Sequence, residues 1–74
     1  MLKGSRDAVL LKLQPVSIHG QLSYDVIYRF ADEPDGQKSV ARVGPEAIAP
    51  GLDEGDRIVL DFLVGVVTAV RRAS

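Results

Sequence analysis

The sequence predicts an all-β domain, folded as a small antiparallel barrel of five or six strands with an OB-like or SH3-like strand order. The clearest sign is the stretch Gln21–Phe30, where apolar and polar side chains alternate along the chain. This spacing fits a half-buried strand and does not fit the period of about 3.6 residues of a helix. Turn-forming residues also recur at intervals of about ten residues, which is typical of short strands joined by tight turns. A barrel is expected because closure hides the edges of the sheet.

A first strand is expected over residues 8–14. Leucines occupy both of its faces, with Leu10 on one and Leu11 on the other, which indicates a strand covered on both sides. Pro15 has no backbone N–H to give to a sheet, so it favours an edge or a bulge at this point. Residues 16–18 could continue the strand beyond the proline, and Gly20 marks the turn that follows.

The second strand is expected over Gln21–Phe30 and its partner over Lys38–Val43. Between them, Pro34 and Gly36 predict a hairpin loop, because proline presets the first turn position and glycine accepts a positive φ. We expect the inner face of the second strand to be largely aromatic. Its members alternate along the strand and are Leu22, Tyr24, Val26, Tyr28 and Phe30.

One short helical turn is expected near residues 45–49, because Pro45 suits the first helical position and Glu46 suits the first turn. Residues 51–56 then form an acidic turn. Two further strands are expected over residues 57–63 and 66–70, with Gly65 between them. The predicted organisation is an N-terminal arm over residues 1–7 and a single barrel domain over residues 8–72.

Composition excludes several classes of site. The chain has 74 residues, a net charge of −1, no cysteine and a single histidine, His19. Disulfides, thiolate zinc sites, thiol catalysis and histidine metal clusters are therefore excluded. The carboxylates of the acidic turn lack the ligand spacing of a calcium loop. No nucleophile elbow or glycine-rich phosphate loop occurs, so we expect no catalytic residues, no metal, no cofactor and no enzymatic activity.

Charge is distributed unevenly along the chain. Residues 31–56 contain seven acidic and two basic side chains, whereas the segments before and after them each have a small positive balance. The acidic side chains fall in expected loops, which indicates solvated turns. No signal-peptide pattern follows Met1, and the longest apolar run, residues 62–67, is too short to cross a bilayer. A cytoplasmic location without membrane contact is expected.

The acidic turn also carries a family resemblance. Residues 51–56 read Gly-Leu-Asp-Glu-Gly-Asp and precede a strand, and residues 46–48 stand at the position of a helical turn. This arrangement resembles the TOBE or Mop-type molybdate-binding small β-barrels, and the central segment is also similar to small bacterial β-barrel domains of unknown function. The first resemblance implies an oxyanion site at a subunit interface, with Ser5 and Arg6 as its matching residues. The last hairpin departs from the family, because Thr68 is its only hydroxyl.

A second reading assigns single-stranded nucleic acid to the barrel. Tyr24 and Tyr28 would stack on bases, and Arg29 and Arg42 would contact phosphates. The two tyrosines share their face with apolar core positions, and the neighbouring loops are acidic. The sequence therefore disfavours nucleic acid as a partner.

Self-association is the leading expectation for function. Residues 62–70 form an uncharged stretch of high β-propensity, which is an aggregation hazard when exposed. It lies either inside the barrel or against a second chain, and a short domain without disulfides gains stability from the second arrangement. We expect a non-enzymatic binding or assembly module that forms a homo-oligomer, with a homodimer favoured over a higher oligomer, or that binds a protein partner. The contact residues would be Phe62, Val64, Val66 and Val67.

Overall fold

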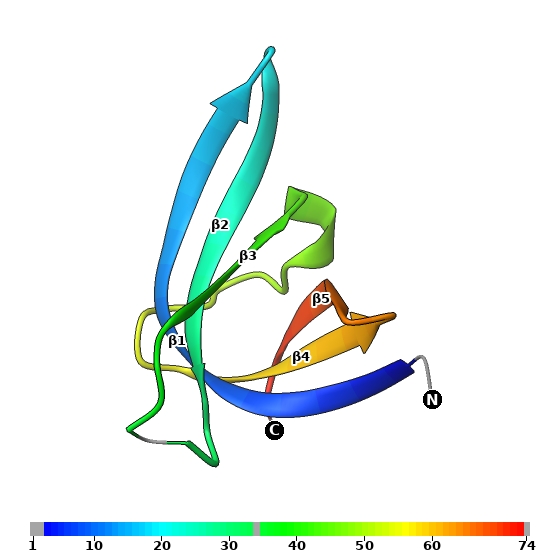
Figure 1. The fold of residues 1–74 in the computed structure, drawn as a ribbon. Coiled ribbons are helices and arrows are strands. Elements are labelled where there is room, and N and C mark those ends of the chain that lie inside the picture. Colours follow the sequence, from blue (N-terminus) through cyan, green and yellow to red (C-terminus); the bar gives the residue numbers. More distant parts are fainter. Residues whose placement is uncertain (1–2, 34, 74) are drawn as a thin grey trace.

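The computed structural model describes residues 3–33 and 35–73 of the chain. This part is all-β, with five antiparallel strands in one sheet and one short 3-10 turn, as Figure 1 shows. The strands follow the order β3-β2-β1-β4-β5 across the sheet. The elements are β1 (Lys3–Ile18), β2 (Gln21–Phe30), β3 (Ser39–Val43), η1 (Pro45–Ala47), β4 (Arg57–Leu63) and β5 (Val66–Arg72). No helix within the described residues has both the length and the apolar character needed to cross a bilayer.

Strand β1 belongs to both halves of the sheet. Its first part, Lys3–Val9, pairs with β4, and the part from Ala8 to Ile18 pairs with β2. The pairing with β2 shifts between Leu10 and Lys12, so Leu11 is an extra residue in a β-bulge. A bulge bends its strand, and β1 changes direction along its length in Figure 1. Because the bulge shifts the alternation by one residue, Leu10 and Leu13 lie on the same, core-facing side of β1, and the expected strand with two covered faces is not what the structure has.

The start of β1 differs from the expected arm. Residues 3–7 form a ladder with β4, in which Lys3 lies opposite Leu63 and Asp7 opposite Val59. Backbone hydrogen bonds make this ladder, so it needs no apolar side chains and leaves no period-two pattern to read. Residues 1–2 of the expected arm lie outside the described residues. The strand also continues through Pro15, where β1 has a strand neighbour on one side only, as expected for proline at an edge.

The core is apolar and draws on all five strands. In the described residues it contains no buried polar or charged side chain. Tyr28 is buried as expected, but Leu22, on the same face of β2, is 46% exposed. The β1–β2 hairpin extends beyond the rest of the sheet in Figure 1, so its far end has nothing to cover it. The buried residues are Ala8, Leu10, Val26, Tyr28, Val43, Ile58, Leu60, Val67 and Val70.

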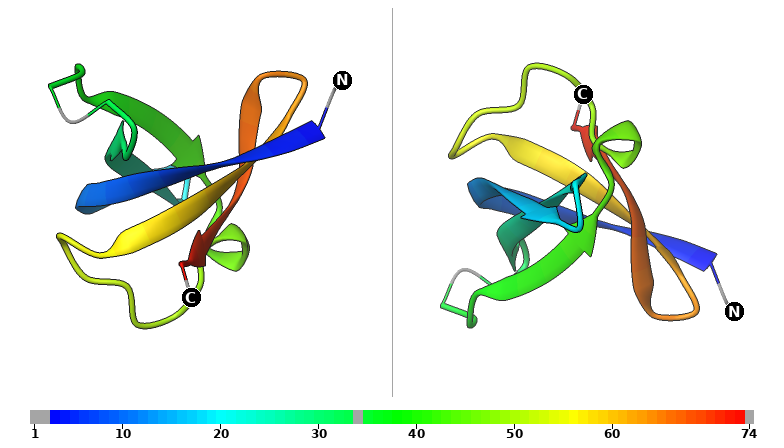
Figure 2. Two further views of the ribbon diagram at one scale, coloured as in Figure 1. Left: turned by 90° about the horizontal axis from the view of Figure 1, so that it is seen from below. Right: turned by 90° about the horizontal axis from the view of Figure 1, so that it is seen from above.

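The sheet is curved but is not closed by a complete ladder. β3 and β5 are its two edges, and Figure 2 shows them approaching each other near η1. There, Ile48 forms a parallel bridge with Val70, and the Ala49 N–H donates to the Val70 carbonyl at 2.9 Å. Elsewhere β3 and β5 line an open cavity of about 250 Å³, which we call the seam. The closed barrel expected from the sequence is therefore not confirmed.

Two hairpins end in two-residue turns with positive φ at both positions. The β1–β2 turn contains His19 (φ 52°) and Gly20 (φ 78°), and the β4–β5 turn contains Val64 (φ 52°) and Gly65 (φ 76°). This left-handed pair suits the twist of a hairpin and normally favours asparagine or glycine. Val64 is β-branched, so its conformation is strained.

Candidate functional site

Exposed apolar side chains gather around the seam. Val40 on β3 is 61% exposed, and Val66 at the start of β5 is 63% exposed, and both line the same cavity. Leu63 lies opposite Val66 in the β4–β5 ladder, and Val64 follows in the turn. We call these four residues, Val40, Leu63, Val64 and Val66, the seam patch.

The four residues expected to mediate self-association divide between the core and the surface. Val67 is buried, and Phe62 is half-buried with its ring centroid 6.3 Å from that of Phe30. Val64 and Val66 belong to the exposed seam patch. Alternation along β4 and β5 causes this division, because neighbouring residues point to opposite faces.

Val40 was not among the residues expected to mediate association. It lies on β3, more than twenty residues before β5 in the sequence. Val40 lies opposite Ile27 in the β2–β3 ladder, and this pairing places it at the outer side of the seam. Val40 lies three residues before the core residue Val43, so their side chains point to opposite faces of β3. This inference needs the bounds of the strand, which the local sequence pattern alone does not provide.

The residues proposed for nucleic acid do not form a stacking platform. Tyr28 is 6% exposed and packs edge-on against Phe30, with ring centroids 5.3 Å apart. Arg29, next to it on β2, points to the opposite face. Tyr24 is half-buried on the same side of β2 as Tyr28. The four residues are therefore divided between two faces of one strand pair.

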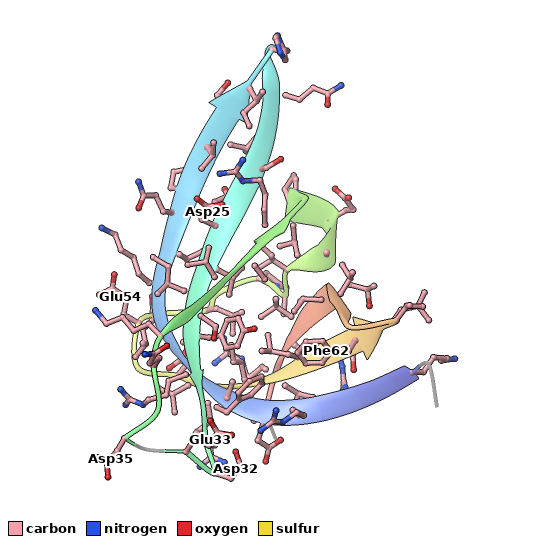
Figure 3. All side chains as sticks on the ribbon, viewed as in Figure 1. Asp25, Asp32, Glu33, Asp35, Glu54 and Phe62 are labelled. Carbon is pink, nitrogen blue, oxygen red and sulfur yellow. The ribbon has the colours of Figure 1, made fainter. Side chains whose placement is uncertain are left out.

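Arg42, the remaining member of that set, is paired with Asp25, which is labelled in Figure 3. Its Nε donates to Oδ1 of Asp25 at 2.8 Å, and its Nη2 donates to Oδ2 at 3.2 Å. This two-point hydrogen bond lowers the pKa of Asp25 below its ordinary value and raises the pKa of Arg42. A phosphate would have to compete with a carboxylate that already holds the guanidinium in a two-point hydrogen bond.

The two residues that carry the oxyanion resemblance, Ser5 and Arg6, also face opposite sides of their strand. The Ser5 hydroxyl donates to Oδ1 of Asp61 at 2.6 Å. The Arg6 guanidinium lies 3.5 Å from the centroid of the Phe30 ring and contacts Asp32 at 3.1 Å. A carboxylate beside each donor disfavours an incoming anion through like-charge repulsion.

Asp61 is the centre of the best-connected polar cluster. Nε of Arg71 donates to its carboxylate at 2.7 Å and Nη2 at 2.9 Å, in addition to the bond from Ser5. The hydrogen bonds from Arg71, and then the one from Ser5, lower the pKa of Asp61 to about 2. The cluster joins β1, β4 and β5 on the outer side of the sheet, so its evident role is to hold these strands in register.

The acidic turn is held by the carboxylate of Asp56 and by a backbone hydrogen bond to β1. Oδ2 of Asp56 accepts a hydrogen bond from the Asp53 N–H at 2.9 Å and lies 3.5 Å from Nη1 of Arg72. The Gly55 N–H donates to the Leu10 carbonyl at 2.7 Å, which fastens the turn to β1 beside the bulge. Over residues 3–33 and 35–73, no three His, Asp or Glu side chains come together as a group that could hold a metal ion.

Comparison with known proteins gives no match: no family model, no curated protein and no solved structure matches this chain.

Proposed function

We propose that the protein is a non-enzymatic binding and assembly module that forms a homodimer through the seam patch. One observation carries this proposal: two of the three most exposed large apolar side chains, Val40 and Val66, line an opening between two sheet edges. The third, Val64, lies in the β4–β5 turn two residues before Val66. Apolar side chains that gather around an opening mark an interaction surface more often than single exposed ones do.

The fold supports a binding role for this surface. Five strands that curl until their edges approach each other describe a partly open, OB-like barrel. Barrels of this type bind their ligands on the second and third strands and on the loops that include the β4–β5 connection. The seam patch occupies two of these places, because Val40 lies on β3 and Val64 lies in the β4–β5 turn.

The chemistry of the patch favours a protein over a nucleic acid. Its four side chains are aliphatic and uncharged, whereas a nucleic-acid groove needs aromatic faces and available cations. The cation that lines the seam, Arg42, is paired with Asp25. Removing an aliphatic surface of this kind from water lowers the free energy, which is how the core of a protein interface is stabilised.

Light scattering of the purified chain over a wide range of concentrations tests the proposal. We expect a dimer at low micromolar concentration, and we expect Val66→Lys to shift the population to monomer because it places a charge in the contact. Ile18→Lys is the matched control, because Ile18 is an exposed apolar residue in the other hairpin. This control should remain dimeric. A wild-type chain that stays monomeric at the highest concentration would overturn the proposal.

Molybdate-like oxyanion binding is the weaker alternative, because a carboxylate accompanies both Ser5 and Arg6. Calorimetry with molybdate and tungstate distinguishes it, and the absence of heat at millimolar ligand would eliminate it.

A further inference from the structure

We propose that each copy of the homodimer inserts the side chain of its Val64 into the seam of the other copy. This inference rests on the proposed function, since it names the residue that joins the two copies. The partner is a second copy of this chain, and the contact is made by apolar side chains rather than by the pairing of strand edges.

The seam connects the surface of the molecule with its core. Val40 and Val66 line its outer part and are 61% and 63% exposed, whereas Tyr28, which also lines it, is 6% exposed. Phe62 lines the seam as well and is half-buried. A side chain that enters this opening leaves water and contacts the aromatic rings of the core, so its burial is favourable. The seam is therefore suited to receive an apolar group from outside the chain.

The size and the lining of the seam favour an uncharged side chain as its occupant. Its volume of about 250 Å³ lies below the range of about 300–1,000 Å³ that is usual for small-molecule sites. Of the described residues that line it, Arg42 alone is charged, and Asp25 already holds its guanidinium. A second charged group in the seam would lose its hydration without gaining a free partner. An aliphatic side chain carries no such cost.

Val64 lies beside the seam without filling it. The next two residues, Gly65 and Val66, line the cavity, whereas Val64 does not. Val64 is also the most exposed large apolar residue in the described part of the chain, at 64%. Its φ of 52° is unfavourable for a β-branched residue, and backbone strain of this kind clusters at binding sites. Val64 is therefore the side chain best placed to enter a second copy.

The contact is reciprocal, because Val64 and the seam lie next to each other at the β4–β5 turn. A two-fold axis that brings the Val64 of one copy to the seam of the other also brings the second Val64 to the first seam. Both openings are then occupied, and no site is left for a third copy. Reciprocal insertion therefore predicts a closed dimer and excludes a higher oligomer through this surface.

Complementary variants test the insertion. Val64→Ala shortens the entering side chain, and Ala41→Leu fills the seam, because Ala41 lines it on β3. We expect either variant alone to raise the dissociation constant of the dimer at least about tenfold, since its homodimer has two empty or two blocked contacts. An equimolar mixture should dimerise again, because the intact Val64 of one copy meets the open seam of the other. In the second contact, the shortened side chain meets the filled seam.

Sedimentation equilibrium measures these dissociation constants. Ile18→Ala is the matched control, because it shortens an exposed β-branched side chain in the other hairpin, and it should leave the dissociation constant unchanged. Val64→Asn separates the contact from the fold, since asparagine suits the left-handed turn. It should still raise the dissociation constant at least about tenfold, because an amide inside the apolar seam lacks hydrogen-bond partners.

Nuclear magnetic resonance measures the contact directly in a mixture of isotope-labelled and unlabelled chains. Only contacts between copies then give filtered cross-peaks, and we expect one between the Val64 methyl groups and the ring of Tyr28, which lines the seam. A chain that scatters as a monomer removes the homodimer and this insertion together. A dimer without this cross-peak, or one whose affinity neither Val64→Ala nor Val64→Asn changes, overturns the insertion and leaves the homodimer standing. Weakening by both complementary variants without recovery in their mixture has the same meaning.

Discussion

At the scale of single residues, Val64 has a backbone conformation that is unfavourable for its residue type. It is a β-branched residue with φ of 52°, and it is 64% exposed, so burial in its own chain does little to offset the strain. The equivalent position in the β1–β2 turn is His19, which has the same φ. A strained, exposed valine in the turn of a hairpin is understandable if its side chain serves a contact outside the monomer.

Val64→Asn should stabilise the monomeric fold by about 1 kcal/mol, because asparagine adopts the left-handed region with less strain. Chemical denaturation under conditions where the chain is monomeric measures this gain. Val64→Thr retains the branched Cβ and is the matched control, for which we expect no comparable gain. Equal stability of the asparagine and wild-type chains would show that the turn is not strained.

Asp61 should make the stability of the chain depend on pH. Its pKa falls from 3.8 to about 2 in the folded state, so its contribution is complete above the ordinary pKa and is lost as the pH falls through about 2. Asp61→Asn should cost about 1 kcal/mol at neutral pH, since these hydrogen bonds are partly open to water. The difference in unfolding free energy between wild type and this variant should shrink from pH 4 to pH 2.

Asp7→Asn supplies the comparison for that experiment, because Asp7 is an exposed carboxylate whose contact with Arg57 is longer, at 3.5 Å. We expect this change to have a smaller effect than Asp61→Asn at neutral pH. A difference between wild type and Asp61→Asn that stays constant over the acidic range would contradict the role assigned to the cluster.

The partners of Ser5 and Arg6 could not be predicted from the sequence. Ser5 meets Asp61, and Arg6 meets Phe30 and Asp32, all of which are distant along the chain. Such contacts depend on the register between strands, which no local pattern records. The exposure of Val64 and Val66 could be predicted from the sequence, because the uncharged run around them is longer than a small core can bury.

At the scale of elements, alternation was a reliable guide where one face of a strand is buried. The expected bounds of β2 and β4 agree with the structure, and the helical turn lies near its expected place. The first residues of β1 were misread as an arm because their side chains are exposed on both sides of the sheet. Period-two patterning reports burial rather than pairing, so a strand held by backbone bonds alone stays hidden.

Leu60→Ala should cost about 3 kcal/mol of unfolding free energy, because the Leu60 side chain is fully buried in β4 and truncation leaves a cavity. Leu63→Ala, in the same strand, removes the same atoms from a side chain that is 45% exposed. This control should cost less than about 1 kcal/mol in the monomer. Urea denaturation of the two variants measures both values, and similar losses would contradict the assigned burial.

At the scale of the whole molecule, the open seam distinguishes the structure from a closed barrel. The all-β class and the antiparallel strands were predictable from turn spacing and alternation. The order β3-β2-β1-β4-β5 was not, because it depends on β1 meeting β4 across the intervening half of the chain. Closure likewise depends on how far β3 and β5 curl toward each other, which follows from twist and from the bulge in β1.

If the chain dimerises as proposed, its thermal midpoint should rise with protein concentration, because dissociation accompanies unfolding. Differential scanning calorimetry over a wide concentration range measures this dependence. Val66→Lys should abolish it, while Ile18→Lys should preserve it. A wild-type midpoint that is independent of concentration would count against a dimer in the folded state.

The double membership of β1 has a consequence for the rate of folding. Its ladder with β2 joins residues that are near neighbours around a turn, whereas its ladder with β4 joins Lys3 to Leu63 and Val9 to Arg57. Closing such a long loop costs chain entropy before any contact compensates for it. The N-terminal meander and the C-terminal hairpin can each form early, and the encounter that brings β4 alongside β1 then determines how quickly the native chain appears.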